Sequence, residues 1–147
     1  MEIYLIREGH PLWDKTIAYA QNVSWNAGPF LAEKMKRNDF LEWERVVIAV
    51  EEDRIIGFCT YTEKDALPER YDFMPFIGFV FVDENDRGNR VSERMIDQAI
   101  RYAKEIGFST VYLTSDEHGL YEKYGFKKIG DYDTIHGTEE QLFQRNI

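Results

Sequence analysis

Cysteine and histidine are scarce in this chain of 147 residues, and their scarcity limits its chemistry. Cys59 is the only cysteine, which excludes an internal disulfide and fits a reducing compartment. A metal site built from cysteine pairs is excluded as well. The three histidines, His10, His118 and His136, lack the close spacing of metal ligands, so we expect no metal cofactor.

Long apolar runs are also missing. The N-terminus lacks the apolar core of a signal peptide. The longest apolar run, Phe76–Val82, is far too short to cross a bilayer. We therefore expect a cytoplasmic protein with no membrane partner.

Basic side chains are outnumbered, with 18 against 27 acidic ones, and the formal net charge is −9. This balance repels a phosphate backbone, so we expect no nucleic-acid partner, while a cationic acceptor is compatible with it. Apolar residues make up 44% of the chain and charged residues 31%, as in packed globular proteins. No repeat or flexible linker interrupts it, which predicts one domain over residues 1–147.

Hydrophobic periodicity predicts the order of the secondary structure. We expect strands at 2–7, 45–50, 54–62, 76–82, 110–114, 126–129 and 141–143, and helices at 11–23, 29–40, 90–106 and 119–124. In the second helix, Phe30, Leu31, Lys34 and Met35 should form the buried side. Gly78 within its strand indicates a bulge or a close backbone approach, and the polar segment 63–75 is predicted to be a loop bordering a site.

The turn between strand 76–82 and helix 90–106 carries the most informative signal. Free backbone N–H groups and a helix dipole of roughly half an elementary charge favour an anion there, and Arg87 and Arg90 add positive charge. Gly88 tolerates backbone angles that other residues avoid, and the small Ser92 lets a ligand approach the first helical turn. An ordinary structural turn, with its arginines paired to the acids at 83, 84 and 86, is the alternative interpretation.

Two segments resemble motifs of the GNAT superfamily of N-acetyltransferases. Val80–Ser92 resembles the motif that ends in Arg/Gln-x-x-Gly-x-Gly/Ala, with Arg87 in its first position. Arg90 and Ser92 depart from it, because they stand where the two small residues are usual. Leu120–Phe126 resembles the closing motif, an aromatic-Tyr-Glu-Lys-x-Gly-Phe run, at the expected distance downstream.

The resemblance spans almost the whole chain and implies a fold and a co-substrate. It implies a mixed, mostly antiparallel α/β (α+β) sheet of six or seven strands around a central parallel β-α-β unit. Strands 76–82 and 110–114 should splay apart and hold the pantetheine arm of acetyl-CoA, with backbone near Phe81 and Val82 polarising the thioester. The implied cofactor-binding residues are Val80, Phe81, Val82, Arg87, Gly88, Asn89, Arg90, Val91, Ser92 and Thr114.

The proposed reaction is direct attack of a primary amine on the thioester, and it needs an acid and a base. Tyr121 matches the superfamily's usual tyrosine and is our candidate acid toward the leaving sulfur, with packing of the short helix as the alternative. The base is open, and His118 is our named candidate because imidazoles suit proton transfer near neutral pH. The other conceivable bases are carboxylates, at Glu63, Asp65, Glu69, Asp72, Asp116 and Glu117.

Several aromatic and sulfur side chains have other candidate roles. Core packing is the preferred interpretation for Trp13, Trp25 and Trp43, and among them Trp25 is the best candidate for an acceptor pocket. Tyr124, Phe126 and Cys59 are expected in the core. The acceptor is a small-molecule or peptide amine, and a homodimer is compatible with the family.

Two further functions stay open at this point. The first is a non-catalytic acyl-CoA-binding sensor domain of the same fold. The second is a phosphate-ligand-binding module outside the family.

Overall fold

A computed structural model describes all residues, 1–147. Its elements follow the order β1 (Glu2–Ile6), α1 (Trp13–Asn22), α2 (Gly28–Lys36), β2 (Arg45–Glu51), β3 (Arg54–Thr62), β4 (Phe76–Val82), η1 (Glu84–Asp86), α3 (Val91–Glu105), β5 (Thr110–Ser115), α4 (Leu120–Lys123), β6 (Lys127–Asp133) and β7 (Glu139–Asn146). The seven strands form one sheet in the order β1-β2-β3-β4-β5-β7-β6. Only β4 and β5 are parallel, so the mixed, mostly antiparallel sheet is confirmed.

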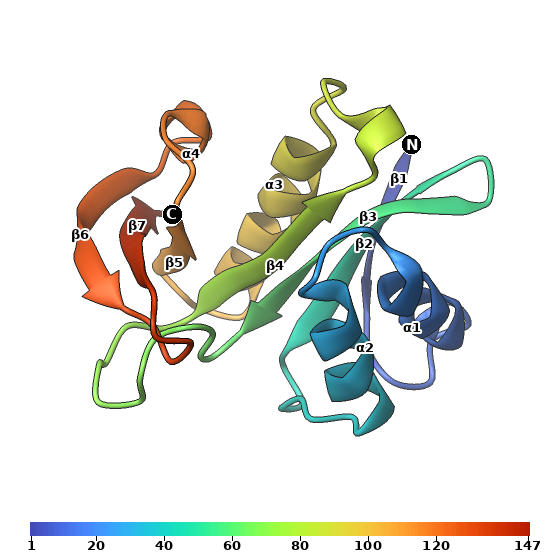
Figure 1. Ribbon diagram of the computed structural model, residues 1–147, viewed down its shortest axis with the longest axis horizontal. Coiled ribbons are helices and arrows are strands. Elements are labelled where there is room, and N and C mark those ends of the chain that lie inside the picture. Colours follow the sequence, from blue (N-terminus) through green and yellow to red (C-terminus); the bar gives the residue numbers. More distant parts are fainter.

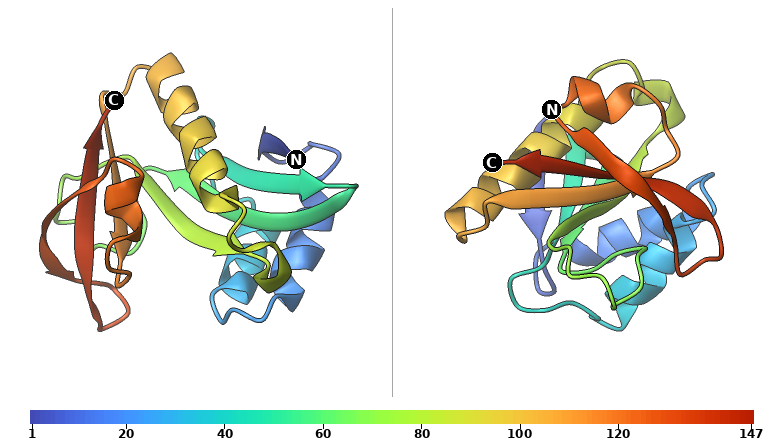
Figure 2. Two further views of the ribbon diagram at one scale, coloured as in Figure 1. Left: turned by 90° about the horizontal axis from the view of Figure 1, so that it is seen from above. Right: turned by 90° about the vertical axis from the view of Figure 1, so that its left-hand side faces the viewer.

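Helices cover both faces of the sheet, as Figures 1 and 2 show, with α1 and α2 on one side and α3 on the other. In β2, Val46 and Ile48 join the core beneath α1 and α2, whereas Val47 and Ala49 join the core beneath α3. Strands buried on both faces need apolar residues at successive positions, which explains the unbroken apolar runs.

Helix α3 spans the residues that its periodicity predicts. Met95, Ile96, Ala99 and Ala103 are fully buried against the sheet. The opposite face is charged and exposed. The apolar stripe therefore fixes the rotation of α3, and with it the direction in which its N-terminus points.

The predictions for the second helix were partly wrong. Helix α2 ends at Lys36 instead of Phe40, because Asn38 adopts a left-handed φ of 47° and its amide donates to the Met35 carbonyl over 3.0 Å. Phe30, predicted to be buried, is 73% exposed. The buried positions are Leu31, Ala32 and Met35, one helical face that excludes position 30.

The final hairpin is longer than predicted. Strands β6 and β7 extend beyond 126–129 and 141–143, and Gly137, with a φ of 80°, lies in the turn between them. The added residues are largely polar because β6 is an exposed edge strand. Polar edges resist pairing with other chains but look like loops in a sequence.

Candidate active site

The parallel pair β4–β5 opens into a gap. Its ladder holds one residue pair, Phe76 with Tyr112, at the start of β4. Beyond that pair the strands diverge, and the end of β4 is paired with β3 alone, through Phe81 and Val82. The predicted splay is confirmed, and it leaves backbone groups of β4 facing the gap.

A β-bulge lies in β4 beside the gap. The register against β3 passes from Gly78 opposite Thr60 to Phe81 opposite Phe58, and Phe79 takes a left-handed φ of 50°. Bulges re-aim side chains and are common beside active sites. The neighbour that comes close to Gly78 is a side chain instead of a backbone, because an added Cβ would lie 2.6 Å from Oδ2 of Asp65.

The N-terminus of α3 presents unpaired donors. No backbone N–H from Arg87 to Glu93 donates to an acceptor within the protein. We call the segment 87–92 the amide end. Gly88 has a φ of 85°, and Arg90 takes a left-handed φ of 62° in the position where the motif usually has glycine. Adjacent amides in such turns point to one side and favour an anion.

The two arginines are not tied up by the acids before them, which was the structural alternative. Arg87 donates from Nε to the Val82 carbonyl over 3.0 Å, with its guanidinium over the Phe81 ring. Arg90 pairs with Glu93 over 2.6 Å. Both guanidinium groups therefore leave the amides at the start of α3 uncovered.

A cavity of about 1050 Å³ joins the amide end to the gap between β4 and β5. Ten of the twelve predicted site residues line it: Val80, Phe81, Val82, Arg87, Gly88, Arg90, Val91, Ser92, Thr114 and Tyr121. Asn89 and His118 are exposed and lie outside the lining. The free backbone N–H of Asn89 still belongs to the amide end, whereas nothing in the cavity supports His118 as the base.

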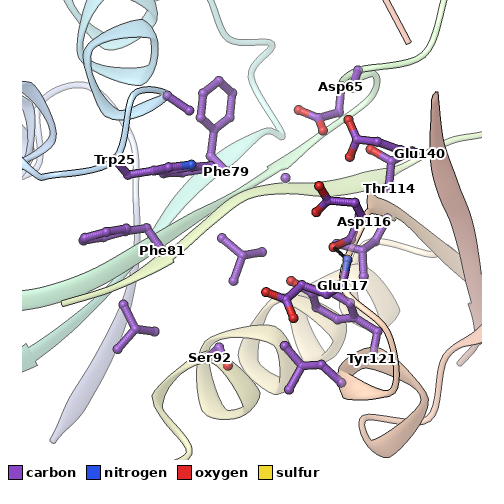
Figure 3. Close-up of a pocket in the computed structure, with 18 of the residues that line it drawn as sticks. Trp25, Asp65, Phe79, Phe81, Ser92, Thr114, Asp116, Glu117, Tyr121 and Glu140 are labelled. Atoms are coloured by element: carbon purple, nitrogen blue, oxygen red, sulfur yellow. Dashed lines mark hydrogen bonds between the residues drawn. The ribbon is translucent and has the colours of Figure 1, made fainter. Parts of the chain in front are cut away.

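Tyr121 reaches the cavity from α4, beside Glu117 (Figure 3). It is buried, and its ring also packs on Phe143 and Tyr124 with centroids 5.8 and 6.0 Å apart. Burial raises the pKa of the Tyr121 phenol, with a smaller contribution from Cys59. The side chain thus packs the helix and keeps its proton at the cavity.

Of the three side chains expected in the core, two are buried there and one lines the cavity. Phe126 and Cys59 are buried, as predicted, and burial raises the pKa of the Cys59 thiol to about 12, so it is no nucleophile. Tyr124, predicted to be core, instead lines the cavity, where its hydroxyl lies 2.9 Å from Oγ of Ser92. The contact between Tyr124 and Ser92 joins residues far apart in the chain, so the sequence pattern around α4 could not predict it.

Aromatic side chains form one side of the cavity (Figure 3). The Trp25 ring stacks on Phe81 with an interplanar angle of 6° and meets Phe79 edge-on. Trp25 lines the cavity and is also packed, partly buried, against the core beneath α1 and α2. Trp13 is buried in that core, as predicted. We call the side chains of Trp25, Phe79 and Phe81 the aromatic wall.

Carboxylates form the side opposite the aromatic wall (Figure 3), and we call them the carboxylate wall: Asp65, Asp116, Glu117 and Glu140. Burial raises the pKa of Asp65 to about 6, and the charge of Glu140 adds to the rise. Burial likewise raises the pKa of the Glu140 carboxyl, with Asp116 adding to it. These groups are not arranged to hold a metal ion together.

Sequence reasoning missed Glu140 and His136, which line the cavity from the last hairpin. They arrive there because β7 inserts between β5 and β6, a strand order that no local pattern encodes. No helix of the chain has both the length and the apolar character of a membrane span.

An open β-α-β unit with free amides, a deep cavity and a buried tyrosine defines a class of protein that binds an extended phosphorylated ligand between its strands. The sequence model of the acetyltransferase (GNAT) family matches residues 12–126. The chain belongs to this family and is an N-acetyltransferase. Membership removes the alternative of a phosphate-binding module outside the family.

Solved structures share the fold at low sequence identity. The aminoglycoside 6'-N-acetyltransferase from Enterococcus faecium has a TM-score of 0.76 at 18% identity, covering 99% of this chain and 97% of its own. An aminoglycoside 6'-N-acetyltransferase complexed with coenzyme A has a TM-score of 0.73 at 17% identity, with the same coverage. The IAA acetyltransferase from Bacillus cereus has a TM-score of 0.65 at 16% identity, covering 99% of both chains. No curated protein sequence matches the chain significantly.

Proposed function

We propose that this protein transfers the acetyl group of acetyl-CoA to a primary amine of a cationic small molecule or peptide, by direct attack. The observation that carries the proposal is the single cavity that connects the amide end, the β4–β5 gap, Tyr121 and the carboxylate wall. The amide end suits a diphosphate and the carboxylate wall suits an ammonium group, so the two substrates can lie end to end in one cavity.

In this proposal the amide end binds the diphosphate of acetyl-CoA. Seven successive N–H groups lack protein acceptors there, and the α3 dipole favours negative charge. The pantetheine arm would run along the unpaired edge of β4, bonding to the backbone at Val80 and Val82. The thioester would then lie within the gap, near Tyr121.

The chemistry needs stabilisation of two developing negative charges. Backbone N–H groups near Phe81 and Val82 would polarise the thioester carbonyl. Tyr121 would donate a hydrogen bond, and then its proton, to the departing sulfur. Its raised pKa keeps the phenol protonated, so the hydroxyl is present as a donor when the sulfur departs.

The carboxylate wall supports a cationic acceptor. Four carboxylates line the cavity, where they can contact an ammonium group directly. The net charge of −9 adds a long-range attraction that brings cationic amines to the protein. The aromatic wall adds a face on which a cation or an apolar body packs. Aminoglycosides, after which several acetyltransferases of this fold are named, are polyamines of this kind.

The test is a thiol-release assay with acetyl-CoA and spermidine, kanamycin, phenethylamine and lysine methyl ester. We expect release with at least one amine, loss of most of it in Tyr121→Phe, and the mass of an acetylated product. Micromolar binding of acetyl-CoA without release on any amine would contradict the proposal and favour the sensor domain. A cytoplasmic location, a single domain and a homodimer stay predictions from the sequence.

A further inference from the structure

The loop between β3 and β4, residues 63–75, sends one acidic side chain back into the cavity. Asp65 lines the cavity beside Glu140, and its carboxylate faces the space between the two walls (Figure 3). Other acidic residues of the loop, such as Glu69 and Asp72, are exposed and lie outside the lining. Asp65 is therefore the one side chain through which this loop brings a charge to the site.

Gly78 makes the position of Asp65 sterically allowed. A Cβ at position 78 would lie 2.6 Å from Oδ2 of Asp65, 2.5 Å from Cγ and closer still to Oδ1. Carbon atoms do not approach so closely, so any other residue at 78 would displace the carboxylate. The φ of Gly78 is not in the left-handed region, so the backbone itself does not require glycine. The missing side chain of Gly78 thus serves as the seat of the Asp65 carboxylate.

The seat lies next to the place proposed for the thioester. Gly78 lies on the same strand as Val80, Phe81 and Val82, whose backbone is proposed to hold the pantetheine arm and polarise the thioester, with the β-bulge at Phe79 between them. An amine bound between the Asp65 carboxylate and this part of β4 can pass its proton to the carboxylate directly or through one water. Resting on the function proposed above, we propose that Asp65 is the catalytic base that takes the proton of the acceptor's ammonium group. Glycine is needed at position 78 because any side chain there would displace the Asp65 carboxylate.

The proton and electron balance is complete without a further reactant. The ammonium gives one proton to Asp65, and the freed lone pair forms the C–N bond to the acetyl carbon. The C–S bond breaks, and the sulfur leaves with its electron pair and accepts a proton from Tyr121. The second proton lost by nitrogen returns to Tyr121 through solvent, and Asp65 releases the first proton to solvent.

The surroundings of Asp65 suit this role. Burial raises the pKa of its carboxyl to about 6, near the pH at which a base acts best. The charged groups that act on its pKa are Glu140 on β7, His136 in the β6–β7 turn and Lys34 on α2. Asp116, which follows β5, acts in turn on Glu140. Glu140 raises the pKa further, whereas His136 and Lys34 lower it.

The test uses Asp65→Asn and the most active amine of the panel above. We expect kcat/KM to fall about 100- to 1000-fold, with the Kd of acetyl-CoA unchanged within about twofold. The acidic limb of the wild-type pH profile, near pH 6, should disappear. Asp133→Asn, an exposed carboxylate on β6 outside the cavity, is the matched control and should keep full activity.

Moving the carboxylate gives an independent readout. Asp65→Ala should be as slow as Asp65→Asn. Adding Gly78→Asp to Asp65→Ala should raise kcat/KM at least about tenfold, because the new side chain begins beside the place of the lost carboxylate. Gly78→Ala alone should lose activity with Asp65 still present. A pH limb retained in Asp65→Asn, or a raised KM with unchanged kcat, would overturn the assignment. Failure of the wild-type protein to acetylate any amine would instead overturn the proposed function.

Discussion

The amide end and the carboxylate wall share one cavity but differ in origin and in charge. The amide end is built from consecutive residues, 87–92, and presents main-chain donors. The carboxylate wall is assembled from the β3–β4 loop, the segment after β5, and β7, and presents side-chain acceptors. Main-chain donors stay in place when side chains are substituted, whereas a single substitution removes a side-chain acceptor. Substitutions should therefore change the carboxylate wall more readily than the amide end.

Blocking the amide end should have the largest effect. Ser92→Glu places a carboxylate in the first turn of α3, where it repels the diphosphate and fills space beside the amides. We expect the Kd of acetyl-CoA to rise at least about 100-fold, roughly 2.7 kcal/mol, by isothermal titration calorimetry. Ser92→Ala is the control, and it should stay within about fivefold although it loses the Tyr124 contact. Equal affinities of the two variants would mean that the diphosphate binds elsewhere.

Removing the Tyr121 hydroxyl affects the chemistry between the two regions. Tyr121→Phe should lower kcat about 10- to 100-fold, because the leaving thiolate loses its donor, while acetyl-CoA binding is unchanged. Steady-state and single-turnover thiol release measure the two quantities separately. The packing role alone predicts a different result, namely a lower melting temperature with kcat unchanged.

The buried charge on the carboxylate wall should weaken the fold. The pKa of Asp65 is raised in the folded state, to about 6 from 3.8, so the native protein holds a proton that the unfolded chain has released between these values. The free energy of unfolding therefore falls as pH rises from about 4 to 6 and stays low above. Asp65→Asn should be about 1 to 2 kcal/mol more stable than wild type at pH 7, and the difference should vanish at pH 4. Urea unfolding at both pH values measures it, and a less stable variant at pH 7 would contradict the account.

A single change at the rim of the carboxylate wall should have the smallest effect. Glu140→Gln removes one of four carboxylates, so we expect the KM for a dicationic amine to rise about fivefold with kcat and acetyl-CoA affinity unchanged. The effect should shrink at 0.5 M salt, because screening weakens long-range attraction. An identical KM at low and high salt in both proteins would argue against electrostatic recognition.

The same comparison explains how much was predictable from the sequence. The amide end could be found because it is one continuous segment with a recognisable spacing, and ten predicted site residues line the cavity. Its left-handed Arg90 could not be anticipated, since non-glycine residues rarely adopt that conformation. The strand order was not derivable either, because pairing of β7 with both β5 and β6 depends on long-range contacts.

The carboxylate wall was only partly predictable. Asp65, Asp116 and Glu117 were among the conceivable bases, but nothing local separated them from exposed acids such as Asp72. What separates Asp65 is its contact with Gly78, thirteen residues away across a loop. The loop closes because Lys64 bonds to the carbonyls of Tyr71 and Phe73, and such contacts have no period in a sequence.

The claim on which the account depends is that main-chain donors at the start of α3 hold the diphosphate of the acetyl donor. Titration of ¹⁵N-labelled protein with coenzyme A, followed by amide chemical shifts, tests it residue by residue. We expect the amides of residues 87–93 to shift strongly with coenzyme A and hardly at all with pantetheine, which lacks the diphosphate. Shifts of the same size with both ligands, or none in this segment, would contradict the account.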